Sequence, residues 1–191
     1  VLVFTELCHS CGACAYLCPL RASKETEHPI GVIGEAQLPG YGTLLTGRLN
    51  VGEALSPPLI KATKSQKATS ALRIVDCPPG TTCAMIESIS DSDYCLLVTE
   101  PTPFGLHDLE LSLEAIEMLG IPGGLVINRW QGEDSDLIAL SDKTGVPILG
   151  RIPFSPELAQ AYMQGKDPLE AMPSLRGILT DIFSQIKGAL S

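Results

Sequence analysis

Hydrophobic residues in the second half of the chain fall into short, nearly continuous runs, separated by segments with helical periodicity. The runs cover residues 72–76, 94–99, 124–128 and 146–152. Runs of this length with little polar alternation are typical of parallel strands that are covered on both faces. In residues 106–119, 134–144, 156–164 and 174–190, apolar positions recur at helical spacing, which predicts four helices. This alternation predicts an α/β fold with a doubly wound, mostly parallel sheet.

The first 70 residues follow a different pattern. Residues 31–55 are rich in glycine and alternate apolar with polar positions, which predicts short strands or a hairpin. Ser56 followed by Pro57 is typical of a helix start, so we expect a polar helix to about residue 69, with a flexible linker as the alternative. The chain therefore divides into a cysteine module over 1–30, connecting strands and helix over 31–70, and an α/β domain over 71–191.

Composition and charge exclude several classes of protein. The chain has 191 residues, of which 45% are hydrophobic and 18% charged, as in globular proteins with a proper core. Residues 1–70 carry a net charge of +1 and residues 71–191 one of −10. The acidic body argues against general nucleic-acid binding, and no apolar run approaches the length of a membrane span. Free thiols fit a reducing compartment, so we expect a cytoplasmic protein.

Four cysteines lie close together near the start of the chain. Cys8, Cys11, Cys14 and Cys18 are followed by Pro19, which is the C-x2-C-x2-C-x3-C-P spacing of bacterial-type [4Fe–4S] ligation. Zinc sites usually join two cysteine pairs across a dozen or more residues, and disulfide frameworks suit small secreted chains. In two-cluster ferredoxins the fourth cysteine of such a run ligates the other cluster. Cys18 therefore either closes one cluster or serves a second one.

Several polar and conformationally special residues follow the predicted strands. Ligands in open α/β sheets bind at the carboxyl ends of the strands. Asp76 precedes Cys77-Pro78-Pro79-Gly80; such an aspartate can orient magnesium, and such a glycine lets the backbone approach a γ-phosphate. The amide of Asn128 can read an adenine edge, and Pro153 with its neighbours could form the wall of an adenine pocket. Taken singly, each could equally serve a turn, a cap or the core.

Taken together, these segments resemble one family in order and spacing. The runs are IVDCPPG over 74–80, YCLLVTEPTPFGLHDL over 94–109, GGLVINR over 123–129 and PILGRIPFSPELAQAYMQG over 147–165. They resemble the MinD/ParA/Mrp-type P-loop ATPases, in particular the members with an inserted ferredoxin-like domain that holds two [4Fe–4S] clusters. The resemblance covers nearly the whole chain. It implies a [4Fe–4S] cluster and ATP with Mg2+ as cofactors, Asp76 on the magnesium side, Gly80 as switch glycine, Asn128 as adenine reader and Pro153 in the base pocket.

Residues 1–191 lack two motifs that the family carries. The phosphate-binding loop GKGGxGK(S/T) does not occur in residues 1–191, and Gly165-Lys166-Asp167 lacks both the preceding glycines and the following hydroxyl residue. Without that loop there is neither a cradle of N–H groups nor a lysine for the phosphates. A first cluster motif is also missing, and Val1 is not a methionine. We therefore expect the chain to be the C-terminal two-thirds of a longer protein, and the fragment alone not to turn over ATP.

These observations predict an iron–sulfur P-loop ATPase that couples ATP binding and hydrolysis to electron transfer or cluster delivery. Its expected partners are a second copy of itself and a redox or cluster-acceptor protein. The alternative is a non-enzymatic electron-transfer or cluster-carrier module on a nucleotide-binding fold. An amide-forming ligase of the same fold is a third reading, which we disfavour because those enzymes usually carry a glutaminase domain.

Two further cysteines need an interpretation. Cys83 lies seven residues after Asp76, a spacing at which the related nitrogenase iron protein has a cluster ligand at its dimer interface. That site needs a second, upstream cysteine, and residues 19–76 contain none. We therefore expect Cys83 to be a buried or pocket-lining thiol, with a redox or interfacial role as the alternative. Cys95, between apolar neighbours in a predicted strand, should lie in the core.

Overall fold

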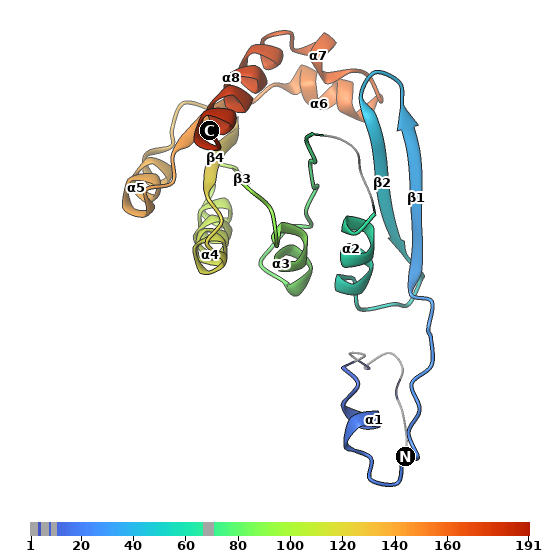
Figure 1. Ribbon diagram of the computed structural model, residues 1–191. Coiled ribbons are helices and arrows are strands. Elements are labelled where there is room, and N and C mark those ends of the chain that lie inside the picture. The colour runs from blue at the N-terminus through green and yellow to red at the C-terminus, as the bar shows by residue number, and fades with distance from the viewer. Residues whose placement is uncertain (1–3, 5–7, 9–10, 67–70) are drawn as a thin grey trace. The chain divides into compact units, whose positions relative to one another are not determined.

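The computed structural model describes residues 4, 8, 11–66 and 71–191, and these divide into two compact units (Figure 1). The first unit is Val1–Pro78 with Thr82–Ser88, and the second is Pro79–Thr81 with Ile89–Ser191. The first contains α1 (Ala13–Leu17), β1 (Gly31–Leu38), β2 (Gly42–Leu49), α2 (Pro57–Lys64) and most of α3 (Cys83–Ile89). Each unit is described by itself below.

The first unit is built on a β-hairpin. β1 and β2 pair antiparallel, from Gly31 opposite Leu49 to Leu38 opposite Gly42. α2 packs on this hairpin through Leu59, which is buried. The predicted hairpin and the helix after Ser56 are therefore confirmed. The helix ends at Lys64, and residues 67–70, where we expected its last turn, lie outside the described residues.

The second unit is a parallel sheet with helices. Its strands are β3 (Cys95–Thr99), β4 (Gly123–Trp130) and β5 (Ile148–Pro153), in the spatial order β3-β4-β5. The helices are α4 (Pro103–Leu119), α5 (Ser135–Thr144), α6 (Pro156–Met163), α7 (Pro168–Ala171) and α8 (Ser174–Ala189). The α/β class, the parallel pairing and the four predicted helices are confirmed. α4 ends where the sequence predicted, at Gly120 in the left-handed conformation.

Helices cover both faces of this sheet, as expected for a doubly wound fold. Gly123 of β4 faces Ile116 of α4, whereas Gly150 of β5 faces Ile178 and Ile182 of α8. Leu125 and Ile127 are fully buried, and Val126, on the opposite face, packs in a cluster with Leu149 and Ile182. Successive residues of β4 thus point into two separate cores, which is why this strand is apolar throughout. Cys95 is buried in β3, as predicted.

One predicted strand is not formed. Residues 72–76 have no strand assignment, and within this segment Leu72 and Ile74 are 54% and 84% exposed. An apolar run becomes a strand only when a neighbouring backbone completes its hydrogen-bond ladder. The described residues supply no such neighbour for this segment, so the prediction of a fourth strand here is wrong for this structure.

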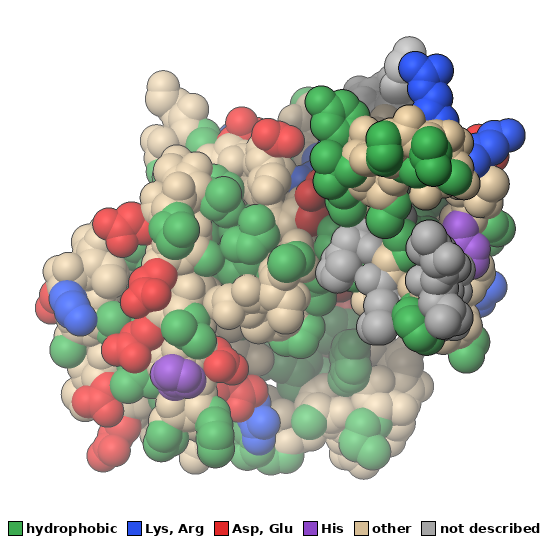
Figure 2. All heavy atoms as spheres, turned by 90° about the horizontal axis from the view of Figure 1, so that it is seen from below, with side chains coloured by type: hydrophobic (Ala, Val, Ile, Leu, Met, Phe, Trp, Pro, Cys, Tyr) green, Lys and Arg blue, Asp and Glu red, His purple; other side chains and the backbone are tan. Residues whose placement is uncertain are grey.

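The acidic composition is visible on the surface. Figure 2 shows Asp and Glu side chains spread over the left part of the face that it presents. No helix among the described residues is both long and apolar enough to cross a membrane.

Candidate functional site

The cysteine run surrounds the short helix α1. Cys8, Cys11 and Cys14 are exposed and Cys18 is half-buried, and each of the seven cysteines of the chain is a free thiol. Cys14 lies in α1, which begins after Gly12 in the left-handed conformation (φ 76°) and ends before Cys18. This local structure follows from the sequence, because Gly12 is free to adopt the positive φ that turns the chain into the helix.

Backbone N–H groups surround the sulfur of Cys18. The amide nitrogen of Ala22 donates to Cys18 Sγ at 3.2 Å. This bond, followed in importance by one from the Ser23 backbone, lowers the pKa of the Cys18 thiol. Hydrogen bonds to sulfur favour the thiolate, which is the form that ligates metals. Cys18 is therefore in a chemical environment that suits a cluster ligand.

The four thiols are not arranged as a finished ligand set. Among the described residues, no group of three or more His, Cys, Asp and Glu side chains is placed to hold a metal ion. The donors themselves fit an iron–sulfur cluster, because four free thiols at this spacing can supply four thiolates. Ligation by Cys8, Cys11, Cys14 and Cys18 therefore remains a prediction.

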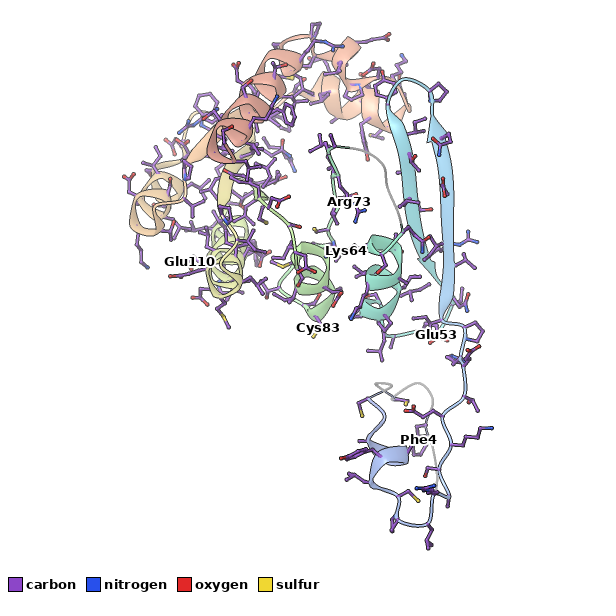
Figure 3. The ribbon with its side chains drawn as sticks, viewed as in Figure 1. Phe4, Glu53, Lys64, Arg73, Cys83 and Glu110 are labelled. Carbon is purple, nitrogen blue, oxygen red and sulfur yellow. The ribbon has the colours of Figure 1, made fainter. Side chains whose placement is uncertain are left out.

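Asp76 lines a cavity in the first unit. The cavity has a volume of about 920 Å³, and its lining comes from β2, α2 and the segment 72–78. Arg73 fastens this segment to the end of α2, since its two terminal nitrogens donate to the carbonyl oxygens of Lys64 (2.7 Å) and Gln66 (3.3 Å). Lys64 Nζ in turn donates to the carbonyl oxygen of Glu87 at 2.7 Å, in α3 (Figure 3). Asp76 is therefore an exposed residue in the lining of this cavity, and hydrogen bonds from Arg73 to α2 and Gln66 hold the segment that carries it.

Gly80 has the backbone conformation that its predicted role requires. Its φ is 83°, in the region that L side chains rarely adopt, and a Cβ placed there would contact nothing within 4 Å among the described residues. The conformation therefore favours glycine, and the surrounding space leaves the backbone accessible. A bare, accessible backbone is what close approach to a phosphate needs.

Two of the predicted site residues of the second unit lie near the carboxyl ends of parallel strands. Asn128 lies near the end of β4, and Pro153 ends β5 opposite Trp130, two residues after Asn128. The amide nitrogen of Phe154 donates to the carbonyl oxygen of Trp130 at 3.0 Å. Asn128 and Pro153 thus lie on neighbouring strands, near the carboxyl ends of both, and their nucleotide roles stay a prediction.

Arg129 and Glu100 form an ion pair near the carboxyl ends of the strands, which the sequence analysis did not predict. Arg129 Nη1 lies 3.4 Å from Glu100 Oε2, and the Arg129 guanidinium lies 5.3 Å from the centroid of the Phe154 ring. Arg129 has a φ of 54°, which no sequence signal indicated, because arginine shows no preference for that region.

The predicted nucleotide-site residues are divided between the two units. Asp76 belongs to the first unit, whereas Gly80, Asn128 and Pro153 belong to the second.

The preferred interpretation of Cys83 is wrong. We expected a buried or pocket-lining thiol, but Cys83 is exposed at the first residue of α3 (Figure 3) and does not line the cavity around Asp76. The physical reason is that Cys83, the first residue of α3, lies on the exposed side of the helix, whereas Met85 in the same turn is buried. The alternative, a redox or interfacial role, stays a prediction.

Two known proteins are similar to this chain in sequence. The uncharacterized protein MJ0579 of Methanocaldococcus jannaschii is 31% identical over 189 residues, covering 97% of this chain and 65% of its own. The cytosolic Fe-S cluster assembly factor NUBP2 of Gallus gallus is 29% identical over 143 residues, covering 61% of this chain and 51% of its own. The chain thus spans less than two-thirds of the length of either relative. No family model matches the chain.

Among solved structures, the MinD cell division protein of Aquifex aeolicus superposes with a TM-score of 0.54 at 20% identity. The match covers 69% of this chain and 61% of that protein. At this identity the likeness concerns the fold alone. The chain therefore has a MinD-like α/β fold, as the resemblance implied.

Proposed function

We propose that the protein is an ATPase that handles iron–sulfur clusters, and that ATP binding and hydrolysis drive delivery of a [4Fe–4S] cluster to an acceptor protein. The observation that carries the proposal is the presence, in one chain, of the Cys8–Cys18 run and a MinD-like sheet with Asn128 and Pro153 at its carboxyl edge. The similarity to a protein named as an Fe-S cluster assembly factor supports delivery over electron transfer.

In this proposal the cluster is cargo held by the cysteine module. Cys8, Cys11, Cys14 and Cys18 are its candidate ligands, and three of the four are exposed. Exposed ligands suit transfer, because incoming thiolates of an acceptor must reach the iron before the original ligands leave. A buried cluster would suit electron transfer between fixed sites better than release.

The proposal assigns each predicted nucleotide-site residue its own role. Asp76 would orient Mg2+, Gly80 would approach the γ-phosphate, Asn128 would read adenine and Pro153 would form part of the base pocket. Phosphoryl transfer depends mainly on positioning and charge stabilisation, so these residues can act only with a phosphate-binding loop. That loop is not in residues 1–191, and the proposal requires it to come from sequence outside them.

The first experiment tests the cluster. The full-length protein is purified anaerobically, its iron and sulfide are measured, and EPR spectra are recorded after reduction. Cys11→Ser and Cys14→Ser should lose a [4Fe–4S] signal that Cys83→Ser, a matched change at another exposed cysteine, retains. Bound zinc, or no metal after anaerobic handling, would contradict the proposal.

The second experiment separates delivery from electron transfer. The loaded protein is incubated with an apo-protein that accepts a [4Fe–4S] cluster, with and without ATP, and iron is measured in both proteins after separation. We expect ATP-dependent loss of iron from the donor, abolished by Asp76→Asn and unaffected by Asp142→Asn on the exposed side of α5. Reversible cluster reduction without iron transfer would favour the electron-transfer module instead.

The quaternary structure follows from the same proposal. In an ATP-driven switch of this kind, we expect nucleotide to bring two copies of the protein together. Light scattering of the full-length protein with ATP under non-hydrolysing conditions should show a mass twice that of the nucleotide-free protein. An unchanged monomer mass would remove the homodimer from the proposal.

A further inference from the structure

Three exposed hydrophobic side chains form a line along α4. Phe104 is 85%, Leu111 38% and Met118 88% exposed. They are spaced by seven residues, which is about 20° short of two helical turns, so all three lie within about 40° of the helix circumference. From Phe104 to Met118 the line is about 21 Å long. We call these three residues the α4 stripe.

The other side of α4 attaches the helix to its own unit. Leu109, Leu113 and Ile116 are buried, and Ile116 faces Gly123 of β4. The α4 stripe is therefore not needed to hold the helix on the sheet. Single exposed apolar side chains are common on protein surfaces, but a line of them along one helix is typical of an interaction surface.

Acidic side chains border the α4 stripe. The helix contains no Lys or Arg, and its acidic residues, all exposed, are Asp108, Glu110, Glu114 and Glu117. Asp108 lies four residues after Phe104, and Glu114 lies four residues before Met118, so both carboxylates neighbour the stripe on the helix surface. None of the four acidic residues has an ion-pair partner among the described residues. Figure 2 shows hydrophobic side chains interspersed with Asp and Glu over the left part of the face that it presents.

The charge of this face determines what can cover it. A second copy of the chain would place the same carboxylates against one another, and anionic lipid head groups or nucleic-acid phosphates would also be repelled. A protein segment with Lys and Arg beside its apolar residues complements both features of the face. A helix suits the shape, because apolar residues at a seven-residue spacing on two helices meet along their whole length.

We propose that the α4 stripe and its acidic border are a docking surface for a basic amphipathic helix of a partner protein. The apolar side chains of that helix cover the α4 stripe, and its Lys and Arg side chains pair with Asp108 and Glu114. Apolar burial supplies the affinity, whereas exposed charges mainly set the specificity and the rate of association. The proposal goes beyond the ATPase function and does not depend on it.

The test measures binding of a synthetic peptide to the full-length protein by fluorescence anisotropy. The peptide has about 20 residues, more than the length of the α4 stripe requires, with leucines alternately three and four positions apart and lysines beside them. A scrambled peptide of the same composition is the control for charge alone. Phe104→Gln with Met118→Gln removes the apolar ends of the stripe, and Asp108→Asn with Glu114→Gln removes two border charges. Met163→Gln on α6 (87% exposed) and Asp181→Asn, exposed on α8, are the matched controls.

We expect the wild type to bind the patterned peptide about tenfold or more tightly than the scrambled one. The Phe104→Gln, Met118→Gln variant should lose about tenfold or more of that affinity, because two large apolar contacts disappear. The Asp108→Asn, Glu114→Gln variant should bind more weakly and with less dependence on salt concentration. The two control variants should bind as the wild type does. Circular dichroism checks that the variants are folded, and Met118→Gln alone keeps the comparison available if the double variant is not.

Three outcomes would overturn the inference. Equal affinity for both peptides, or an unchanged affinity of the Phe104→Gln, Met118→Gln variant, would mean that basic charge alone explains binding. Vesicles of phosphatidylcholine and phosphatidylserine that bind the wild type but not this variant would assign the face to a membrane. A dimer of the wild type that this variant loses in sedimentation would assign it to a second copy of the chain.

Discussion

The hydroxyl of Thr99 donates a hydrogen bond to the carbonyl oxygen of Gly105 at 2.9 Å. Thr99 is the last residue of β3 and is buried. The same loop is closed a second time, because the amide nitrogen of Gly105 donates to Thr102 Oγ1 at 3.1 Å. Together these bonds fix the turn from β3 into α4, and with it the position of Glu100 at the edge of the sheet.

Replacing Thr99 by valine should therefore destabilise the protein. Valine keeps the shape of threonine but leaves the Gly105 carbonyl without this donor, a change that costs about 1–2 kcal/mol for a buried bond. The measurement is the free energy of unfolding from urea denaturation. Thr180→Val is the matched control, since Thr180 makes a comparable bond to the Arg176 carbonyl on an exposed face of α8, and its loss should change the unfolding free energy by less than about 0.5 kcal/mol.

The same loop requires a glycine at position 105. A Cβ at Gly105 would clash with the backbone carbonyl oxygen of Glu100 and lie 3.0 Å from Thr99 Oγ1. Because the obstacle is backbone, Gly105→Ala should destabilise the protein by about 1–3 kcal/mol, as overpacking usually does.

Gly177 provides a control of opposite sign. It lies inside α8, and a Cβ there would meet nothing within 4 Å among the described residues. Gly177→Ala should stabilise the protein by about 0.5–1 kcal/mol, because alanine is the better helix former. Equal effects of the two substitutions on the midpoint of thermal unfolding would contradict the close packing of Gly105 against Glu100.

The loop between β3 and α4 is one part of the structure that can be predicted from the sequence. Pro101, Pro103 and Gly105 favour a stiff connection from strand to helix, and the structure has such a connection between β3 and α4. The periodicity of α4 and α8 and the continuous apolar run of β4 were equally informative, because local patterns decide these elements. The hairpin was predictable from its alternation and its glycines for the same reason.

What could not be predicted depends on contacts distant in the sequence. Residues 72–76 have the composition of a buried strand, but composition does not provide the neighbouring backbone that a strand needs. The positive φ of Arg129 arises from irregular pairing of β4 with β5, which no local pattern encodes. Asn128 and Pro153 were predicted as site residues, whereas the pairing of Arg129 with Glu100 required the register of three strands.

The second unit contains another ion pair, between Arg151 and Asp134. Its loss should reduce the free energy of unfolding more than loss of the Arg129–Glu100 pair. Arg151 Nε donates to Asp134 Oδ2 at 2.6 Å, and the Asp134 side chain is only 9% exposed. Asp134→Asn removes the charge while keeping the shape, and should lower the free energy of unfolding by about 1–2 kcal/mol, below the range for a fully buried pair. Urea denaturation measures the difference.

Glu100→Gln is the matched comparison. The Glu100–Arg129 pair is longer, at 3.4 Å, and more exposed on both sides, and exposed pairs contribute about 0–1 kcal/mol. Its loss should therefore have little effect on unfolding and should weaken further in high salt. A larger cost for Glu100→Gln than for Asp134→Asn would show that burial does not rank these two pairs.

Stability at alkaline pH should depend on Tyr94. This side chain packs against the cluster of Val126, Leu149 and Ile182, and burial, with a smaller contribution from the neighbouring Cys95, raises the pKa of Tyr94. The unfolded chain loses this phenolic proton near its ordinary pKa of about 10, while the folded protein still retains it. Folded protein then binds more protons than unfolded protein, so the unfolding free energy must fall as the pH rises above about 10.

Tyr94→Phe removes this titration. We expect the variant to unfold with a free energy similar to the wild type at pH 8, within about 1 kcal/mol for a lost hydroxyl, and to lose less stability than the wild type between pH 8 and pH 11. The measurement is urea denaturation at a series of pH values. Tyr162→Phe is the control, because Tyr162 is 80% exposed and its replacement should leave the wild-type slope in place. Parallel pH profiles for the wild type and Tyr94→Phe would show that the Tyr94 phenol is no more protected in the folded protein than in the unfolded chain.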